Sequence, residues 1–369
     1  MEENIGSQTK VVGILTSGGD CPGLNAAIRA VGKSLSEHDV ELVGILDGFT
    51  GLIEHRVVHL GFQELSGLLT LGGTILGTSR NKPHKMPQQD GSYIDMTDQA
   101  VENYHRLGLD CLVCLGGGGT QKNAFRLMSQ GGINVVTLPK TIDNDIWGTD
   151  LSFGYDTAMT IACEAIDRLH STASSHHRIM LIDVMGHNTG WLALGAGLAG
   201  GADVILIPEI PYKLDSIYST LRKRKEQGKR FSIVVVAEGA ISQKEAEHAQ
   251  NIRDGLQTPC FNFFPHQIPR SEFLANLIEE EIGLETRVTT LGHLQRGGIP
   301  SPTDRVLATR LGVAAAEHII KNDYGKMMAL KGPDIIGIPL SEVAGEKKFV
   351  TPDHSLVNTA RSLSISLGE

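Results

Sequence analysis

Short, continuously apolar runs recur along this chain, and each is closed by a glycine-rich or polar turn and followed by a helical pattern. The clearest runs span residues 10–16, 111–115 and 179–184. An apolar run of this length predicts a strand that is buried on both faces, and helices between such strands cover those faces. The repeated alternation of strand, turn and helix predicts an α/β protein.

Chain length and net charge limit the number of domains and the kinds of binding partner. A chain of 369 residues indicates about two domains, and the alternation starts again near residue 155. Apolar residues make up 41% of the chain, which is enough for substantial cores. The formal net charge of −9 argues against a nucleic-acid or anionic-membrane partner. An anionic ligand must therefore be held by local clusters of basic residues.

The cysteines form an odd, sparse set that is unlike a disulfide framework: Cys21, Cys111, Cys114, Cys163 and Cys260. Cys111 and Cys114 have a CxxC spacing, which occurs in zinc and redox sites. Positions i and i+3 of a strand point to opposite faces, however, and no second pair exists, so we expect core residues. No apolar stretch is long enough to span a bilayer and no signal peptide is recognisable, so we expect a cytoplasmic protein.

Polar residues gather on a loop directly after a predicted strand at residues 135–138. A proline ends that strand, and the loop carries Thr141, Asp143 and Asp145 beside Lys140. In open α/β sheets, ligands bind at the carboxyl ends of the strands. Two carboxylates at i and i+2, next to a lysine and a threonine, suit a base and a Mg²⁺ ligand facing a phosphate. The alternative is an Asp/Asn turn that only caps a helix.

Two further turns have the character of phosphate-binding loops. Residues 17–23 join a strand to a helix that begins at about Leu24, so backbone N–H groups and the helix dipole can bind a phosphate. The spacing matches neither a Walker A loop nor the Rossmann fingerprint, and tight packing explains many such turns. The four glycines at 116–119 allow a ligand to approach closely, and Thr120 is predicted to cap the next helix.

Basic residues cluster at two places. The hydroxyl-rich segment 72–80 ends in Arg80, which suits bidentate contact with a transferring phosphoryl group; a solvated basic loop is the alternative. Arg287, His293 and Arg296 fall within ten residues around one predicted strand. We expect these three side chains to form a pocket for a phosphate monoester. Residues 241 to about 275 look like an inserted surface segment in which nothing suggests chemistry.

Together these stretches resemble the phosphofructokinase family, in a match that runs from Val12 to about Gly312. The matching motifs are Thr16–Asn25, Gly77–Arg80, Thr141–Asp145, Met185–Gly186 and Gly292–Gly298. The resemblance implies two doubly wound, Rossmann-like domains with mainly parallel sheets and an active site in the cleft between them. It implies a phosphoryl-donor domain of residues 1–154 with about 295–346, and a sugar-phosphate domain of about 155–294 with 347–369.

The reaction that the resemblance implies is phosphoryl transfer from ATP with Mg²⁺, or from pyrophosphate, to the 1-hydroxyl of fructose 6-phosphate. By this carry-over Asp143 is the general base, Asp145 holds the Mg²⁺ and Arg80 stabilises charge on the transferring group. Thr141 and Gly19 line the path of that group. The residues implied to bind the donor are Gly19, Arg80, Asn81, Gly117, Gly118, Gly119, Thr120 and Lys140.

The sugar phosphate is implied to lie against residues from both halves of the chain. They are Thr141, Asp143, Met185, Gly186, His187, Glu238, His293 and Arg296, joined by Arg178 and Arg287. In the family the last two arginines reach across from a neighbouring subunit, so the resemblance implies a homodimer or homotetramer. It implies no nucleic-acid or membrane partner.

The sequence departs from the family pattern at three positions. Gly118 stands where the family usually has an Asp associated with the metal, His187 replaces an Arg, and Asn123 replaces a Gly near the adenine region. Gly119 leaves room for a nucleotide α-phosphate, whereas pyrophosphate-using relatives carry an Asp there together with the lysine at Lys140. ATP is therefore the favoured donor. The alternatives are a pyrophosphate-dependent enzyme, a sedoheptulose-7-phosphate kinase, and a catalytically weak regulatory subunit that binds sugar phosphate.

Overall fold

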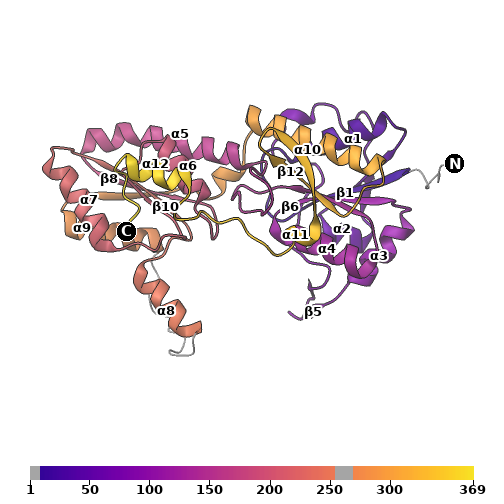
Figure 1. The fold of residues 1–369 in the computed structure, drawn as a ribbon, viewed down its shortest axis with the longest axis horizontal. Coiled ribbons are helices and arrows are strands. Elements are labelled where there is room, and N and C mark those ends of the chain that lie inside the picture. The colour runs from indigo at the N-terminus through magenta and orange to yellow at the C-terminus, as the bar shows by residue number, and fades with distance from the viewer. Residues whose placement is uncertain (1–8, 254–268) are drawn as a thin grey trace. The chain divides into compact units, whose positions relative to one another are not determined.

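The computed structural model describes residues 9–253 and 269–369 of the chain. They divide into two compact units. Unit 1 contains the residues up to Thr157 together with Arg296–Lys348, and unit 2 contains Ala158–Gln295 and Phe349–Glu369. Both units are α/β, so the predicted fold class of mainly parallel sheets is confirmed (Figure 1).

Unit 1 is built on a sheet that has seven strands within the described residues, in the order β13-β12-β7-β6-β1-β2-β3. The pairs from β12 to β2 are parallel, and the two edge strands β13 and β3 pair antiparallel with their neighbours. The strands are β1 Val11–Ser17, β2 Glu41–Ile45, β3 Val57–His59, β6 Cys111–Gly116, β7 Val135–Pro139, β12 Lys326–Lys331 and β13 Asp334–Pro339. A small hairpin of β4 Met86–Pro87 and β5 Tyr93–Ile94 stands apart from this sheet.

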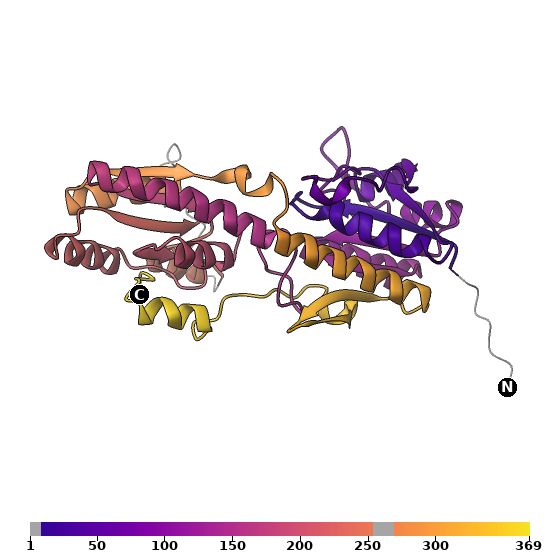
Figure 2. The same ribbon diagram turned by 90° about the horizontal axis from the view of Figure 1, so that it is seen from above.

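Helices cover both faces of the unit 1 sheet. On one face lie α1 Leu24–Ser36 and α10 Pro302–Ile320, which run side by side (Figure 2). Their close approach needs a glycine, because a Cβ atom on Gly312 would come within 2.7 Å of Ala30 Cβ. The other face is covered by α2 Phe49–Glu54, α3 Thr97–Arg106, α4 Gly118–Gly131 and α11 Leu340–Val343 (Figure 1). A short 3₁₀ turn, η1, spans Leu68–Thr70.

Unit 2 has a parallel sheet of four strands in the described residues, ordered β11-β8-β10-β9. The strands are β8 Ile179–Val184, β9 Val204–Leu206, β10 Ser232–Ala237 and β11 Thr286–Thr290. The path from β8 to β9 runs in one direction across the sheet, and the paths to β10 and β11 run back. Because such crossovers are right-handed, the connecting helices lie on opposite faces.

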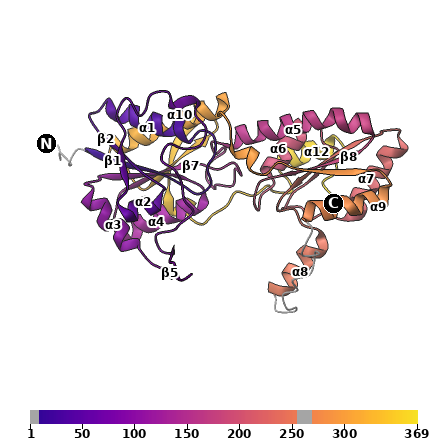
Figure 3. The same ribbon diagram turned by 180° about the vertical axis from the view of Figure 1, so that it is seen from behind.

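The helices of unit 2 follow this rule, with α6 and α12 on one face and α7 and α9 on the other (Figure 3). Their bounds are α5 Tyr155–His176, α6 Trp191–Ala199, α7 Leu214–Glu226, α8 Gln243–Arg253, α9 Arg270–Ile282 and α12 Ser355–Ser362. The 3₁₀ turn η2 spans Gly292–Arg296. Part of the predicted inserted segment forms α8 and α9, and its residues 254–268, with Cys260, lie outside the described residues.

A buried carboxylate on α10 holds the start of α5. Asp304 accepts hydrogen bonds from the backbone N–H groups of Gly154 and Thr157 at 2.9 and 2.8 Å, and from Thr157 Oγ1 at 2.5 Å. Burial raises the pKa of this carboxyl, and the hydrogen bonds from Thr157 oppose that rise. The last residues of unit 1 before the chain enters unit 2 are therefore tied to α10.

Two local predictions were wrong. Thr120 does not cap α4, because the helix begins at Gly118 with Gly117 as its N-cap residue. The helix predicted at 157–171 extends through the serine-rich segment to His176, where Ala173 is fully buried and tertiary packing outweighs weak helix propensity. The prediction for Cys111 and Cys114 is confirmed, since both are free, fully buried core residues. No helix in the described ranges is both long enough and apolar enough to cross a membrane.

Candidate active site

The order of strands in unit 1 reverses between β1 and β6. After β1 the chain adds β2 on one side of β1, and it later returns to add β6 on the other side. The loops that follow β1 and β6 therefore leave the carboxyl edge of the sheet in opposite directions. Reversals of this kind create the ligand crevice of doubly wound sheets. The loop after β7 joins the same edge, because the backbone N–H of Lys140 donates to Gly116 O at 3.2 Å. Three of the loops singled out from the sequence are thus neighbours.

Lys140 is a buried cation beneath the loop that follows β1. Only 3% of the residue is exposed, and its Nζ donates to the carbonyl oxygen of Gly19. Burial lowers the pKa of this ammonium, while the nearby Asp143 and Asp20 act in the opposite direction. The lysine therefore holds the glycine-rich loop in place and brings positive charge to the edge of the sheet.

Arg296 lies against the same loop. A Cβ atom on Gly19 would approach Arg296 Nη1 to 2.7 Å, so the close contact requires a glycine there. The Nε atom of Arg296 is buried and has no hydrogen-bond partner within the described residues. A guanidinium with an unused donor beside a glycine-rich loop is suited to binding an anionic group.

The glycines after β6 have two different roles. A Cβ atom on Gly116 would overlap with the side chain of Thr120, whose Oγ1 donates to Ser17 O at 3.4 Å, so this glycine is needed for packing. Gly118 and Gly119 lie in the first turn of α4, and a Cβ atom on either would meet nothing within 4 Å. The N-terminus of α4 therefore faces open space, where its backbone N–H groups and helix dipole favour a phosphate.

The loop after β7 is fixed by its own hydrogen bonds. Thr141 Oγ1 accepts from the N–H of Asp143 at 3.1 Å, and Thr141 O accepts from Ser152 Oγ at 2.8 Å. Asn144 has a φ of 51°, in the left-handed region that asparagine tolerates better than most residues. Its Oδ1 accepts from the N–H of Ser152 at 3.1 Å. The two carboxylates flank this left-handed residue.

The carboxylates of the loop fit a magnesium ion that arrives with a phosphate ligand. Asp143 is partly buried, and the side chain of Asp145 is 15% exposed with its Oδ2 3.6 Å from Lys347 Nζ. Because this ion pair is long, a metal ion can take the place of Lys347 beside Asp145. No group of three or more His, Cys, Asp or Glu side chains in the described ranges could hold a metal alone. Magnesium commonly uses one or two carboxylates with waters and substrate phosphates, so Asp145 could serve as its protein ligand.

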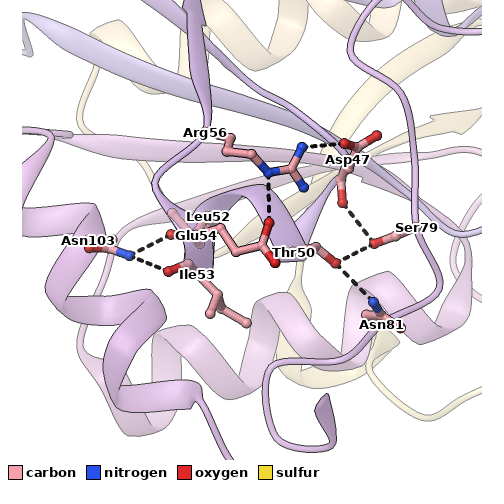
Figure 4. A network of polar contacts seen from close by, with 9 residues as sticks. All are labelled: Asp47, Thr50, Leu52, Ile53, Glu54, Arg56, Ser79, Asn81 and Asn103. Carbon is pink, nitrogen blue, oxygen red and sulfur yellow. Dashed lines mark hydrogen bonds and ion pairs between the residues drawn. The ribbon is translucent and has the colours of Figure 1, made fainter. Parts of the chain in front are cut away.

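Arg80 stands on a loop whose two neighbouring residues are anchored (Figure 4). Ser79 Oγ donates to Asp47 O at 2.8 Å and lies 3.0 Å from Thr50 Oγ1, which accepts from Asn81 Nδ2 at 3.1 Å. Arg80 itself is exposed and makes no hydrogen bond or ion pair within the described residues. The side chain is therefore available to a ligand, while its backbone is fixed.

The surroundings of this loop are held by a second set of contacts in Figure 4. Asp47 forms an ion pair with Arg56, which also pairs with Glu54. Asn103 on α3 donates to the carbonyl oxygens of Leu52 and Ile53 at 2.9 and 2.7 Å, at the end of α2. These bonds tie α2 to α3 and so support the residues that hold Ser79.

In unit 2, the connections that follow the neighbouring strands β8 and β10 run in opposite directions across the sheet. The carboxyl ends of these two strands bring together two of the site residues predicted from the sequence. Glu238, which follows β10, accepts from the backbone N–H of His187 at 2.7 Å. Gly186 and His187 both have positive φ values, of 143° and 51°, so this segment forms a tight turn after β8. The side chains of Glu238 and His187 are exposed at this edge, and His293 follows β11 at the same edge.

Arg178 and Arg287 lie at the opposite, amino-terminal edge of this sheet. Arg178 immediately precedes β8, and Arg287 is the second residue of β11, paired with Met180. Both arginines form ion pairs with Glu285, and these pairs lower the pKa of its carboxyl. Strand β11 separates Arg287 from His293, and Arg296 belongs to unit 1. Within unit 2, Arg287 and His293 therefore stand at opposite ends of strand β11.

The structure adds residues to the site that the sequence did not indicate. Lys348 Nζ donates to Asn144 Oδ1 at 3.0 Å across a separation of 204 residues. Burial lowers the pKa of this lysine to about 8, which the nearby Asp150 and Asp145 partly oppose. Lys347 and Lys348 are adjacent lysines in a charged segment, which is a common pattern on protein surfaces. No local sequence pattern could therefore have identified Lys348 as part of the site.

Comparisons with known proteins identify the family of the chain. Residues 11–319 match the family model described as Phosphofructokinase. The ATP-dependent 6-phosphofructokinase of Spirochaeta thermophila is 54% identical and covers 98% of both chains. The ATP-dependent 6-phosphofructokinase 3 of Bacteroides thetaiotaomicron is 51% identical over 97% of this chain and 99% of its own.

The fold also matches solved structures. The crystal structure of a pyrophosphate-dependent phosphofructokinase from Nitrosospira multiformis has a TM-score of 0.78, at 20% sequence identity. The match covers 97% of this chain and 92% of that one. At this identity the likeness supports the fold alone, whereas the family model and the full-length relatives establish kinship. The chain belongs to the phosphofructokinase family.

Proposed function

We propose that this chain is an ATP-dependent kinase that phosphorylates the 1-hydroxyl of fructose 6-phosphate to give fructose 1,6-bisphosphate, a step of glycolysis. The proposal is supported by relatives of that name that are 54% and 51% identical along nearly the whole chain. The structural observation that carries it is the open space in front of Gly118 and Gly119 at the N-terminus of α4.

The choice of donor follows from that space. An aspartate at Gly119 would place a negative charge where a nucleotide phosphate must lie, and the glycine leaves the helix N-terminus accessible. Lys140, which pyrophosphate-using relatives share, is already engaged with the carbonyl of Gly19. We therefore assign Lys140 to holding the loop after β1 and to lending it positive charge, with ATP as the donor.

The residues of unit 1 supply the groups that phosphoryl transfer needs. Asp143 accepts the proton of the attacking hydroxyl, and Arg80 neutralises charge on the transferring group. Asp145 is the ligand for Mg²⁺, which neutralises charge on the donor phosphates when bound. Thr141, Gly19 and the donor-side glycines shape the path, because catalysis of this kind rests on positioning and charge neutralisation.

The sugar phosphate is assigned to Met185, Gly186, His187, Glu238 and His293 of unit 2, with Arg296 of unit 1. Arg178 and Arg287 lie at the other edge of the unit 2 sheet from Glu238, so one chain cannot direct all of these side chains at one ligand. We propose that the two arginines serve the site of a neighbouring copy, in a homodimer or homotetramer.

The first experiment measures fructose 1,6-bisphosphate formation from fructose 6-phosphate and Mg²⁺, with ATP or pyrophosphate in separate reactions. Turnover with ATP alone supports the proposal. Turnover with pyrophosphate alone overturns the donor assignment. If no product forms with either donor, the function shifts to another sugar phosphate or to regulation. Light scattering on the same sample tests the oligomer, and a monomer would contradict the shared site.

A further inference from the structure

The segment that leaves unit 1 is paired with the loop that carries the candidate catalytic carboxylates. Lys348 is the last residue of unit 1 before the chain enters unit 2. Lys347 forms an antiparallel bridge with Ile146, and the backbone N–H of Lys348 donates to Asp145 O at 3.0 Å. A short strand-like pairing therefore links residues far apart in the sequence.

The side chain of Lys348 satisfies several acceptors of the same loop. Its Nζ donates to Asn144 Oδ1 at 3.0 Å, to Thr149 O at 2.9 Å and to Asp150 O at 2.8 Å. An ammonium has three N–H donors, and these acceptors match that number. One lysine thus joins the start of the loop, at Asn144, to its end, at Thr149 and Asp150.

Asn144 is the residue through which this lysine can influence chemistry. It lies between Asp143 and Asp145 and has a left-handed backbone, so its conformation sets the directions in which the two carboxylates leave the chain. Its Oδ1 is held by Lys348 Nζ and by the N–H of Ser152. Removing the lysine leaves the oxygen with fewer partners and the left-handed turn with less support.

We propose that Lys348 is a positioning residue that, through Asn144, fixes the relative orientation of Asp143 and Asp145. This inference rests on the proposed function, which assigns proton transfer to Asp143 and the metal to Asp145. Lys348 itself is not assigned to contact substrate or metal. It acts on turnover more than on the affinity for the sugar phosphate, because small displacements of reacting groups reduce rate strongly.

The principal test compares Lys348→Met with Lys331→Met. Lys331 forms an exposed ion pair with Asp150 at 3.2 Å and does not hydrogen-bond to Asn144 in the described part of the chain, which makes it a matched control. Lys348→Met is expected to lower kcat about 100-fold and to leave the KM for fructose 6-phosphate within about threefold. Lys331→Met is expected to leave both unchanged. A kcat within about threefold of the unaltered chain, or an equal loss in the control, overturns the proposal.

A second variant keeps the test decisive if Lys348→Met does not fold. Asn144→Gly retains a residue that adopts the left-handed conformation without strain, but it removes the oxygen that Lys348 binds. We expect the same fall in kcat with KM preserved. A fully active Asn144→Gly chain would show that the hydrogen bond to Lys348 does not set the carboxylates, and it would overturn the proposal.

Trp147 provides a readout that needs no activity, since it lies on this loop and is 50% exposed. The only other tryptophan is Trp191, so a Trp191→Phe background leaves one reporter. In that background Lys348→Met should raise the acrylamide quenching constant about twofold, and Lys331→Met should not. Unchanged quenching in Lys348→Met overturns the proposal. If the unaltered chain does not phosphorylate fructose 6-phosphate, the proposed function fails, while this measurement still decides the role of Lys348 in the loop.

Discussion

The hydroxyl of Thr50 lies 3.0 Å from the hydroxyl of Ser79 and accepts a hydrogen bond from Asn81, so one side chain holds both neighbours of Arg80. Thr50→Val keeps the shape and removes both bonds, each worth about 0.5–1.5 kcal/mol. We expect kcat to fall about tenfold, because Arg80 is less well placed. Steady-state kinetics with ATP measure this, and Thr50→Ser, which keeps the hydroxyl, is the control. Equal rates for the two variants would contradict the role of Thr50.

Gly119 offers a test of the donor assignment. An aspartate there adds a carboxylate in the open space at the N-terminus of α4, where it repels donor phosphates. Gly119→Asp should lower kcat/KM for ATP about 100-fold, equivalent to a loss of about 2.7 kcal/mol of transition-state stabilisation. Gly119→Ala adds only a methyl group where no atom is in reach, and should stay within about threefold. A fully active Gly119→Asp chain would place the nucleotide elsewhere.

Asp143→Asn removes the proton acceptor and keeps the shape of the side chain. General-base catalysis typically contributes about 10²–10⁴-fold, and we expect a loss of kcat in that range. Binding of fructose 6-phosphate, measured by calorimetry, should stay largely intact. Turnover at the original rate would remove Asp143 from the role of base, whereas lost sugar binding would indicate a structural role.

Glu285 gives a pH-dependent prediction, because its pairing with Arg178 and Arg287 holds the pKa of the carboxyl below its usual value of 4.5. A depressed carboxyl pKa contributes stability that is present above the unfolded value and is lost as pH falls through the folded pKa. Glu285→Gln should therefore lower the melting temperature near neutral pH. The difference from the unaltered chain should shrink as the pH falls below 4.5.

The control for this prediction is Glu279→Gln, since Glu279 forms only a long ion pair with Arg287, at 3.8 Å, and its hydrogen bond from the N–H of Thr286, at 2.8 Å, can be accepted by a glutamine as well. It should change the melting temperature less than Glu285→Gln does. A difference between Glu285→Gln and the unaltered chain that persists unchanged in acid would show that the glutamate stabilises through packing and not through its charge.

Local pattern was sufficient for the central strands and for the loops that follow them. The run 135–138, the turn at 17–23 and the glycines at 116–119 each combine a buried strand with residues that end it, so their place at the carboxyl edge follows from chain chemistry. The long-range contacts did not follow. Nothing near Lys348 indicates that it binds Asn144, and nothing near Arg178 indicates that Glu285 holds it at the amino-terminal edge.

The edge strands and the end of α5 illustrate the same limit. β3 is short and β13 is largely exposed, so neither has the continuous apolar run that marks a central strand. The end of α5 has serines that propensity disfavours, and only the burial of Ala173 against unit 2 explains why the helix continues. In each case a partner distant in sequence decides the outcome.

The chain crosses between its two units three times, and these crossings limit how the gene can recombine. They follow Thr157, precede Arg296 and follow Lys348, and each of these residues is held within unit 1. Thr157 is bound by Asp304, Arg296 lies against Gly19 and Lys348 binds Asn144. A recombination event that replaced either unit would need three junctions, each beside a contact within unit 1. The parts of such a gene that encode the two units are therefore expected to be passed on together, and new specificities to arise by point substitution.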